Sequence, residues 1–204
     1  MKKLFILTVA CFFAFVGIQA QSSEVEASTQ LTKTEQFKMK CSFIKENVIG
    51  EFKEASVKVL TILYTDLKTG EQLSGLEFFT VDKASGIKIE HLGYLDADQV
   101  NDFLLALETI LKEAKNITRK ETCSISYTAP GGIDVYFYSE KATALGVAIP
   151  QLVVFSKKWI YTNEFGIQQS TSSQNPAVMG ISKLASLIES IKEAQIIAQQ
   201  VLNK

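Results

Sequence analysis

The hydrophobic residues of this chain follow two different periods. Segments rich in Val, Ile, Leu, Phe and Tyr predict largely buried strands at 57–64, 72–81 and 87–94. The sequences between them, Asp66–Gly70 and Asp82–Gly86, each end in a glycine that tolerates positive φ, so they predict hairpin turns. Residues 39–43, with an extension to 52, are a further candidate strand. The first half of the chain is therefore predicted to form antiparallel strands.

Two other segments repeat their hydrophobic residues every three to four positions, which predicts helices at 97–114 and 181–202. Asp96 and Gln99 have the spacing of a capping box, so we expect Asp96 to cap the first helix. The apolar stripe of the second helix is expected to dock on the chain's own sheet. The polar face of that helix carries charges of both signs, which argues against membrane binding.

A second group of strands is predicted at 121–128 and 133–138, and residues 151–156 and 159–165 are predicted to form one or two more, followed by a polar loop at 170–176. If the apolar residues of 133–138 enter the core, Tyr136 and Tyr138 lie on the outer face of the sheet. Trp159 and Tyr161 likewise share one face of their strand. These four aromatic residues are a candidate surface for stacking on sugars or anchoring a partner. The alternative is that the rings pack beneath a helix with their polar ends in water.

The order strands, helix, strands, helix is typical of the α+β class. We predict an antiparallel β-sheet of about six to eight strands, covered on one face by the two helices. The groups 37–115 and 119–204 share this order of elements, and together they are predicted to form one domain over 37–204.

The start of the chain has the pattern of a signal peptide over residues 1–20. Lys2 and Lys3 form a positive segment, an apolar stretch continues to Ile18, and Ala20 is the small residue that a signal peptidase needs. Cleavage after Ala20 predicts an exported protein of the periplasm or the cell exterior.

Residues 21–36 are mostly Ser, Thr, Gln and Glu, and they predict a polar, flexible leader. No apolar run long enough to span a membrane remains after position 20. Acylation at Cys11 is an alternative fate of the N-terminus. It is disfavoured because the residues after Cys11 stay apolar, as in the hydrophobic segment of a signal peptide.

The run Leu63–Glu71, the run Gly93–Val100 that opens the first helix, and the amphipathic helix at the end of the chain together resemble small exported proteins of Bacteroidetes without an assigned function. The end of the signal peptide, Gln19-Ala20-Gln21, is similar to theirs as well. The resemblance covers about residues 40–200. It implies the fold and the exported location, and it supplies no catalytic residue.

The charge of the chain argues against nucleic acid as a partner. There are 21 basic and 22 acidic residues, and Arg119 is the single arginine. Proteins that bind DNA or RNA need clustered Lys and Arg to neutralise phosphates.

Cys41 and Cys123 remain after signal cleavage, and an oxidising compartment would permit a disulfide between them. The alternative is two separate buried thiols. Two cysteines that lie far apart in the sequence do not provide the four closely spaced ligands of a zinc site, so no metal is predicted.

Few residues could carry catalysis. His91 is the only histidine, it lies within a predicted strand, and we interpret it as a half-exposed sheet residue. Asp96, Asp98 and Asp102 resemble the start of a calcium loop, but the glycine and glutamate that such a loop needs are absent. No glycine-rich phosphate loop occurs either, so no cofactor is predicted.

These observations favour a non-enzymatic protein that binds a ligand or a protein partner. One alternative is a hydrolase with an unrecognised pair of carboxylates. Another is an envelope scaffold that acts through an exposed sheet edge.

Overall fold

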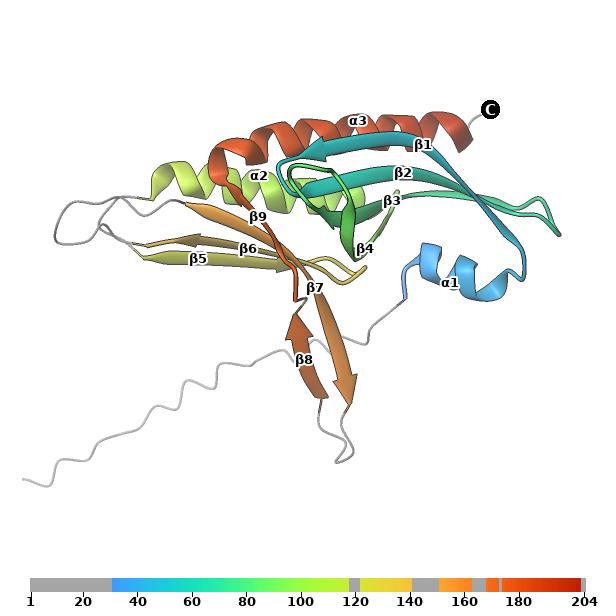
Figure 1. Ribbon diagram of the computed structural model, residues 1–204, viewed down its shortest axis with the longest axis horizontal. Helices are drawn as coiled ribbons and strands as arrows, with labels where there is room; N and C mark the ends of the chain where they lie inside the picture. Colours follow the sequence, from blue (N-terminus) through green and yellow to red (C-terminus); the bar gives the residue numbers. More distant parts are fainter. Residues whose placement is uncertain (1–30, 118–121, 141–150, 163–167, 173, 203–204) are drawn as a thin grey trace, which may run out of the picture.

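The computed structural model describes residues 31–117, 122–140, 151–162, 168–172 and 174–202. It has α+β architecture, with two antiparallel sheets in one layer and two long helices in the other (Figure 1). A short helix, α1, lies on the opposite side of the first sheet (Figure 1). The fold class is therefore as predicted, but the single sheet of six to eight strands is wrong.

The first sheet has the order β1-β2-β3-β4, in which every strand pairs with its neighbour in the sequence. The strands are β1 (Ile44–Glu54), β2 (Val57–Asp66), β3 (Gln72–Val81) and β4 (Lys88–Asp96). Gly70 and Gly86 adopt φ values of 76° and 72° at the two predicted turns, which confirms the reason for glycine there. The candidate strand at 39–43 is wrong in its start, because β1 begins at Ile44.

Helix α1 (Lys33–Lys40) replaces the end of the predicted leader. Thr32 and Glu35 form a reciprocal capping box at its start, and Phe37 packs on the sheet in a small cluster with Leu60 and Tyr64. The leader at 21–36 is therefore too long, because its last residues belong to the fold. Residues 21–30 lie outside the described part.

Asp96 caps a different helix from the one that the sequence suggests. Its carboxylate accepts hydrogen bonds from Lys33 N (2.6 Å), Thr34 N (3.0 Å) and Thr34 Oγ1 (2.8 Å), at the N-terminus of α1. Gln99 still accepts a bond from the Asp96 backbone N–H, which is half of the expected capping box. Asp96 is only 2% exposed, so it joins the end of β4 to the start of α1 in the protein interior.

The second sheet has the order β5-β6-β7, with β8 on one part of β7 and β9 on another. Its strands are β5 (Cys123–Thr128), β6 (Ile133–Ser139), β7 (Leu152–Thr162), β8 (Gln168–Ser172) and β9 (Ala177–Gly180). The predicted segments at 151–156 and 159–165 form one long strand, β7, as far as Thr162, and residues 163–165 lie outside the described part. The first three residues of the predicted polar loop at 170–176 belong to strand β8, which forms an arm with the far half of β7 (Figure 1).

The two sheets meet at a close contact between backbones rather than through a shared ladder. A Cβ atom on Gly131, in the turn before β6, would lie 1.8 Å from the carbonyl oxygen of Tyr94. A Cβ atom on Gly93 would lie 2.3 Å from the carbonyl oxygen of Gly131. Only glycine fits this contact at either position, so a turn lies where a single continuous sheet would need another strand beside β4.

The helices α2 (Val100–Asn116) and α3 (Leu184–Leu202, after a 3₁₀ turn at Ile181–Lys183) lie side by side on the same face. Thr61 and Ser74 of the first sheet donate hydrogen bonds to the backbone of α3. Helix α2 contacts the second sheet, where the ring of Phe103 meets that of Tyr127. Helix α3, from the second half of the chain, therefore covers the first sheet. Helix α2 lies against the second sheet, while its Phe103 also packs on Phe78 of β3 with ring centroids 5.4 Å apart, and one hydrophobic cluster joins both halves.

Candidate functional site

Strand β5 forms one edge of the second sheet. β5 pairs with β6 on one side, and no described strand pairs with it on the other. Ala129 N donates to Ile133 O at the hairpin end, which sets the alternation of the ladder. Antiparallel pairing then directs the backbone N–H and C=O groups of Ser124, Ser126 and Thr128 away from β6, toward the open side.

A groove of about 460 Å³ runs between this edge and helix α2. Its lining residues are Asp102, Leu105, Ala106, Thr109, Ile110, Ile125, Ser126 and Tyr127. Leu105 is 63% exposed at its rim, whereas Ile125 and Tyr127 are half-buried in its floor. The groove therefore combines apolar walls with an unpaired strand edge, which are the two components of sites that bind extended peptides.

One end of the groove is acidic. Burial, and then the nearby Asp102 carboxylate, raise the pKa of Tyr127 above its ordinary value. Asp102 is exposed in the first turn of α2 and has no ion-pair partner among the described residues. It provides a negative charge at the end of the groove where β5 turns toward β6.

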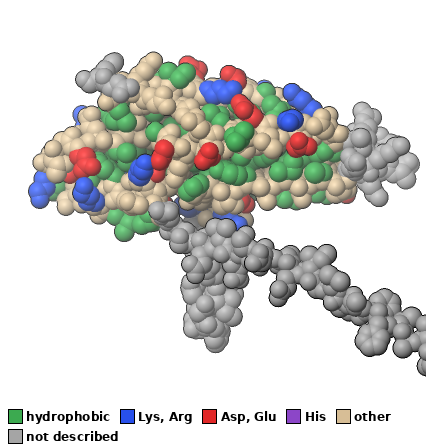
Figure 2. Space-filling model, turned by 180° about the vertical axis from the view of Figure 1, so that it is seen from behind, with side chains coloured by type: hydrophobic (Ala, Val, Ile, Leu, Met, Phe, Trp, Pro, Cys, Tyr) green, Lys and Arg blue, Asp and Glu red, His purple; other side chains and the backbone are tan. Residues whose placement is uncertain are grey.

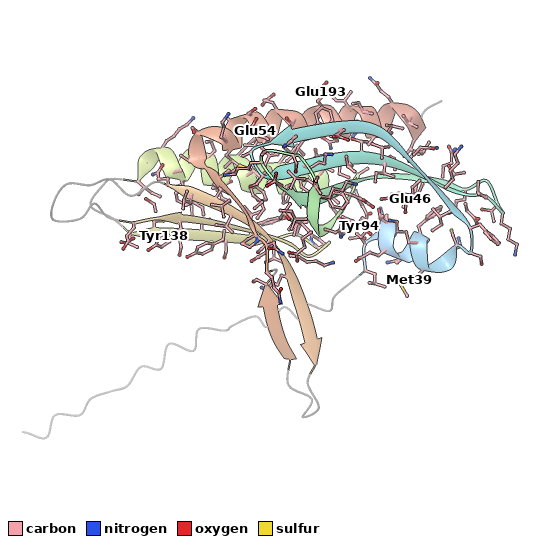
Figure 3. All side chains as sticks on the ribbon, viewed as in Figure 1. Met39, Glu46, Glu54, Tyr94, Tyr138 and Glu193 are labelled. Atoms are coloured by element: carbon pink, nitrogen blue, oxygen red, sulfur yellow. The ribbon has the colours of Figure 1, made fainter. Side chains whose placement is uncertain are left out.

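The predicted aromatic surface is divided between two places. Tyr136 and Tyr138 lie on the helix-free face of β6, with near-parallel rings whose centroids are 6.3 Å apart; Figure 3 labels Tyr138. Their exposure follows from the alternation of β6, as predicted, and Tyr136 is 38% exposed. The backbones of Trp159 and Tyr161 belong to the part of β7 that pairs with β8. Their side chains lie outside the described part, so the structure does not join the four residues into one surface.

The two cysteines are free thiols in this structure. Cys41 follows α1 and packs beside the Phe37 cluster, whereas Cys123 begins β5 in the other sheet. Figure 1 shows α1 and β5 at different ends of the molecule. The candidate disulfide is therefore not formed, because a bridge needs Cα atoms within about 7 Å of each other.

A second cluster of polar side chains lies between α1 and the first sheet, near the labelled Glu46 and Tyr94 in Figure 3. Lys38 Nζ lies 2.8 Å from Glu46 Oε1 and 3.1 Å from Glu77 Oε1. Tyr64 donates a hydrogen bond of 2.6 Å to the same Glu77 oxygen. Lys38 also lies 4.9 Å from the ring centroid of Tyr94.

Every group in this cluster is used to hold the fold. Burial alone would lower the pKa of Lys38, but hydrogen bonds to Glu46 and Glu77 hold it above the ordinary value. Burial and the Glu77 carboxylate raise the pKa of Tyr64. The lysine bridges the two carboxylates, so neither has the free position that a pair of hydrolytic carboxylates requires. We interpret the cluster as the attachment of α1 to the sheet.

His91 lies on the same face of β4, between the rings of Phe79 and Tyr94 at centroid distances of 5.0 and 4.4 Å. Its Nε2 atom is buried and has no hydrogen-bond partner among the described atoms. Burial, together with the positive charges of Lys157 and Lys38, lowers the pKa of His91 to about 4. The side chain is therefore neutral near pH 7 and packs as an aromatic ring.

The described residues include no group of His, Cys, Asp or Glu side chains that could hold a metal ion. Of the three aspartates that resemble a calcium loop, Asp96 caps α1, Asp98 pairs with Lys33 at 2.7 Å, and Asp102 lies at the groove. Asp96 and Asp98 therefore both contact Lys33 at the start of α1, whereas Asp102 belongs to the groove. In the same described part, no helix is long and apolar enough to cross a membrane.

The pattern of the sequence did not connect the residues of this groove with one another, since it grouped Asp102 only with Asp96 and Asp98 and did not single out Leu105 at all. Leu105 and Asp102 lie outside the buried stripe of α2, and an exposed leucine on the polar face of an amphipathic helix was an available signal. The lack of charged residues in β5 was a second signal in the sequence. The meeting of these two features in one groove depends on which helix covers which sheet.

Comparison with known proteins adds no relative: no protein-family model matches the chain, and no curated protein sequence matches it.

Figure 2 shows the molecule from behind, with hydrophobic side chains along its length and with positive and negative side chains interspersed among them.

Proposed function

We propose that this chain is an exported, non-enzymatic binding protein that holds a segment of a polypeptide partner along β5. The proposal rests on one observation: the unpaired edge of β5 adjoins the apolar groove of α2. A segment in extended conformation would satisfy the open backbone groups of three β5 residues and place alternate side chains in the groove. Of the two alternatives from the sequence, the envelope scaffold would use this same sheet edge. A hydrolase would need a pair of carboxylates, whereas Asp102 is the single carboxylate among the described residues that line this groove.

The exported location is part of the proposal and is supported by the sequence. Lys2, Lys3 and Ala20 fit a cleaved signal peptide, and the resemblance to exported Bacteroidetes proteins agrees with it. N-terminal sequencing of the protein recovered from the periplasm or the medium is expected to begin at Gln21. Recovery from the cytoplasm with Met1 retained would contradict export.

Peptide binding at β5 can be tested before the partner is identified. Twelve-residue peptides selected from a displayed random library are the probe, and hydrogen exchange of the full chain locates where they bind. Selected peptides are expected to slow the exchange of the Ser124, Ser126 and Thr128 amides. Selection of no peptide, or protection elsewhere only, would contradict the proposal.

The variant Ser126→Pro tests whether the selected peptides pair with the backbone of β5. The N–H of Ser126 faces the open side, so proline removes a donor that the folded protein does not use. The variant is expected to keep its unfolding temperature and to lose the selected peptides. An unchanged affinity would show that the peptides do not pair with β5.

A further inference from the structure

We infer that the preferred segment is antiparallel to β5 and carries a basic side chain opposite Tyr127, followed by apolar side chains at alternate positions. This inference rests on the proposed function and specifies the chemistry of the partner at the same groove. It follows from the register that β5 would impose and from the position of Asp102.

The register determines which side chains of the segment reach the groove. In an antiparallel ladder, directly opposite residues place their side chains on the same face. Ile125 and Tyr127 face α2, whereas Ser124 and Ser126 are exposed on the other face. Residues of the segment opposite Cys123, Ile125 and Tyr127 would therefore lie against α2, and those opposite Ser124 and Ser126 would face solvent.

The groove differs between its two ends. Ile125, Ile110 and Leu105 are apolar lining residues of the groove, which suits Val, Ile or Leu. Tyr127 lies near Asp102, whose charge acts on the tyrosine hydroxyl. A lysine or arginine opposite Tyr127 could lay its apolar stem along the ring and bring its charge to the unpaired carboxylate. A glutamate there would face repulsion.

The direction follows from the sheet. Every pairing in the second sheet is antiparallel, and antiparallel pairs are slightly more stable per residue than parallel ones. An antiparallel segment begins at the Thr128 end of β5 and ends near Cys123. In chain order its pattern is basic, any residue, apolar, any residue, apolar.

Fluorescence anisotropy with the full chain tests this pattern. The probe is a labelled nine-residue peptide with Lys-Thr-Val-Thr-Val at its centre, compared with Glu-Thr-Val-Thr-Val and with the reversed order Val-Thr-Val-Thr-Lys. The lysine peptide is expected to bind about tenfold more tightly than the glutamate peptide, since attraction is replaced by repulsion at one partly exposed pair. Asp102→Asn is expected to remove that difference, while Asp98→Asn, which changes a nearby carboxylate outside the groove, should leave it intact.

Methylation of single peptide nitrogens tests the register. The N–H groups of the two threonines would face β5, so their N-methylation is expected to abolish binding. The central valine N–H would face away from β5, so its methylation should preserve binding. The opposite result would overturn the register.

The outcomes separate the two proposals. If the peptides protect the β5 amides but lysine and glutamate bind equally, or the reversed peptide binds as well, the inferred pattern is wrong and the proposed function stands. If neither these peptides nor the library peptides protect β5, the proposed function fails and this inference fails with it.

Discussion

Strands β1 and β5 each form one edge of a sheet, and they differ in almost every property that controls pairing with another chain. β1 has eleven residues, five of them charged, and a register shift between Val48 and Gly50 interrupts its ladder. Helix α3 packs along it, and Glu54 bonds to Ser186 and Lys183 at the helix start. β5 has six residues without a charge, a proline or a register shift.

Charges, bulges and covering helices are the devices by which proteins prevent their edge strands from pairing with other chains. The first sheet uses all three devices, and β5 lacks the charges and the bulge. Strand β5 is therefore open to pairing with another chain in a way that β1 of the same protein is not. This contrast is the physical reason to place the partner on β5 rather than on β1.

The largest expected effect comes from breaking the contact that holds the two sheets together. In Gly131→Ala the added methyl group would collide with the carbonyl of Tyr94, and the unfolding free energy should fall by about 3 kcal/mol or more. Urea unfolding followed by circular dichroism measures it. Gly180→Ala is the control, because its Cβ would meet only Ser182 Oγ at 3.8 Å. Equal stability of both variants would contradict the close contact.

The effect of the buried His91 on the stability of the protein can be measured as a function of pH. His91 titrates near pH 6.5 when unfolded and near 4 when folded, so the unfolded state binds its proton first as the pH falls. Above pH 6.5 both states are neutral and the histidine has no effect; between 6.5 and 4 the protein should lose roughly 2 to 3 kcal/mol of stability through this group. Since His91 is the only histidine, His91→Phe should reduce that loss. Parallel stability curves for the two proteins would show that His91 is solvated.

The next largest loss of stability is expected when the contact between α1 and the end of β4 is removed. Asp96→Ala removes three hydrogen bonds to the start of α1 and should cost about 2 kcal/mol. Asp98→Ala removes only an exposed ion pair with Lys33 and should cost a few tenths of a kcal/mol. Thermal unfolding of both variants is the measurement. A larger loss for Asp98→Ala would reverse the roles assigned to the two aspartates.

The smallest change in stability is expected from making β5 resemble β1. Ser126→Lys places a charge on the open edge strand, just as β1 carries Lys45 and Lys53. It should leave the unfolding free energy within about 0.5 kcal/mol of its original value, because the side chain is exposed. Peptides selected on the original protein should bind about tenfold more weakly by anisotropy. Retained affinity would show that edge charge does not control access to β5.

Much of the fold could be predicted because its signals are local. The strands β2, β3 and β4, their two glycine turns and both long helices depend on patterns within about twenty neighbouring residues. Local errors arose where the pattern is weak, as in α1, whose residues are largely polar and whose stability comes from Asp96 and the sheet beneath it. The candidate site was only partly visible, since the exposure of Tyr136 and Tyr138 follows from alternation but the groove at β5 does not.

The sequence by itself determined strands β2 to β4 with their glycine turns, the two long helices and the faces of these elements that become buried, because hydrophobic period and glycine conformation act over short distances. Only the tertiary structure decided that the strands divide into two sheets, because that depends on Gly131 meeting Tyr94 across 36 intervening residues. The tertiary structure also decided that α2 lies beside β5 and that α3 covers the first sheet. This placement of α2 brings Asp102 and Leu105 beside β5, so the candidate site is formed by residues that are distant in the sequence.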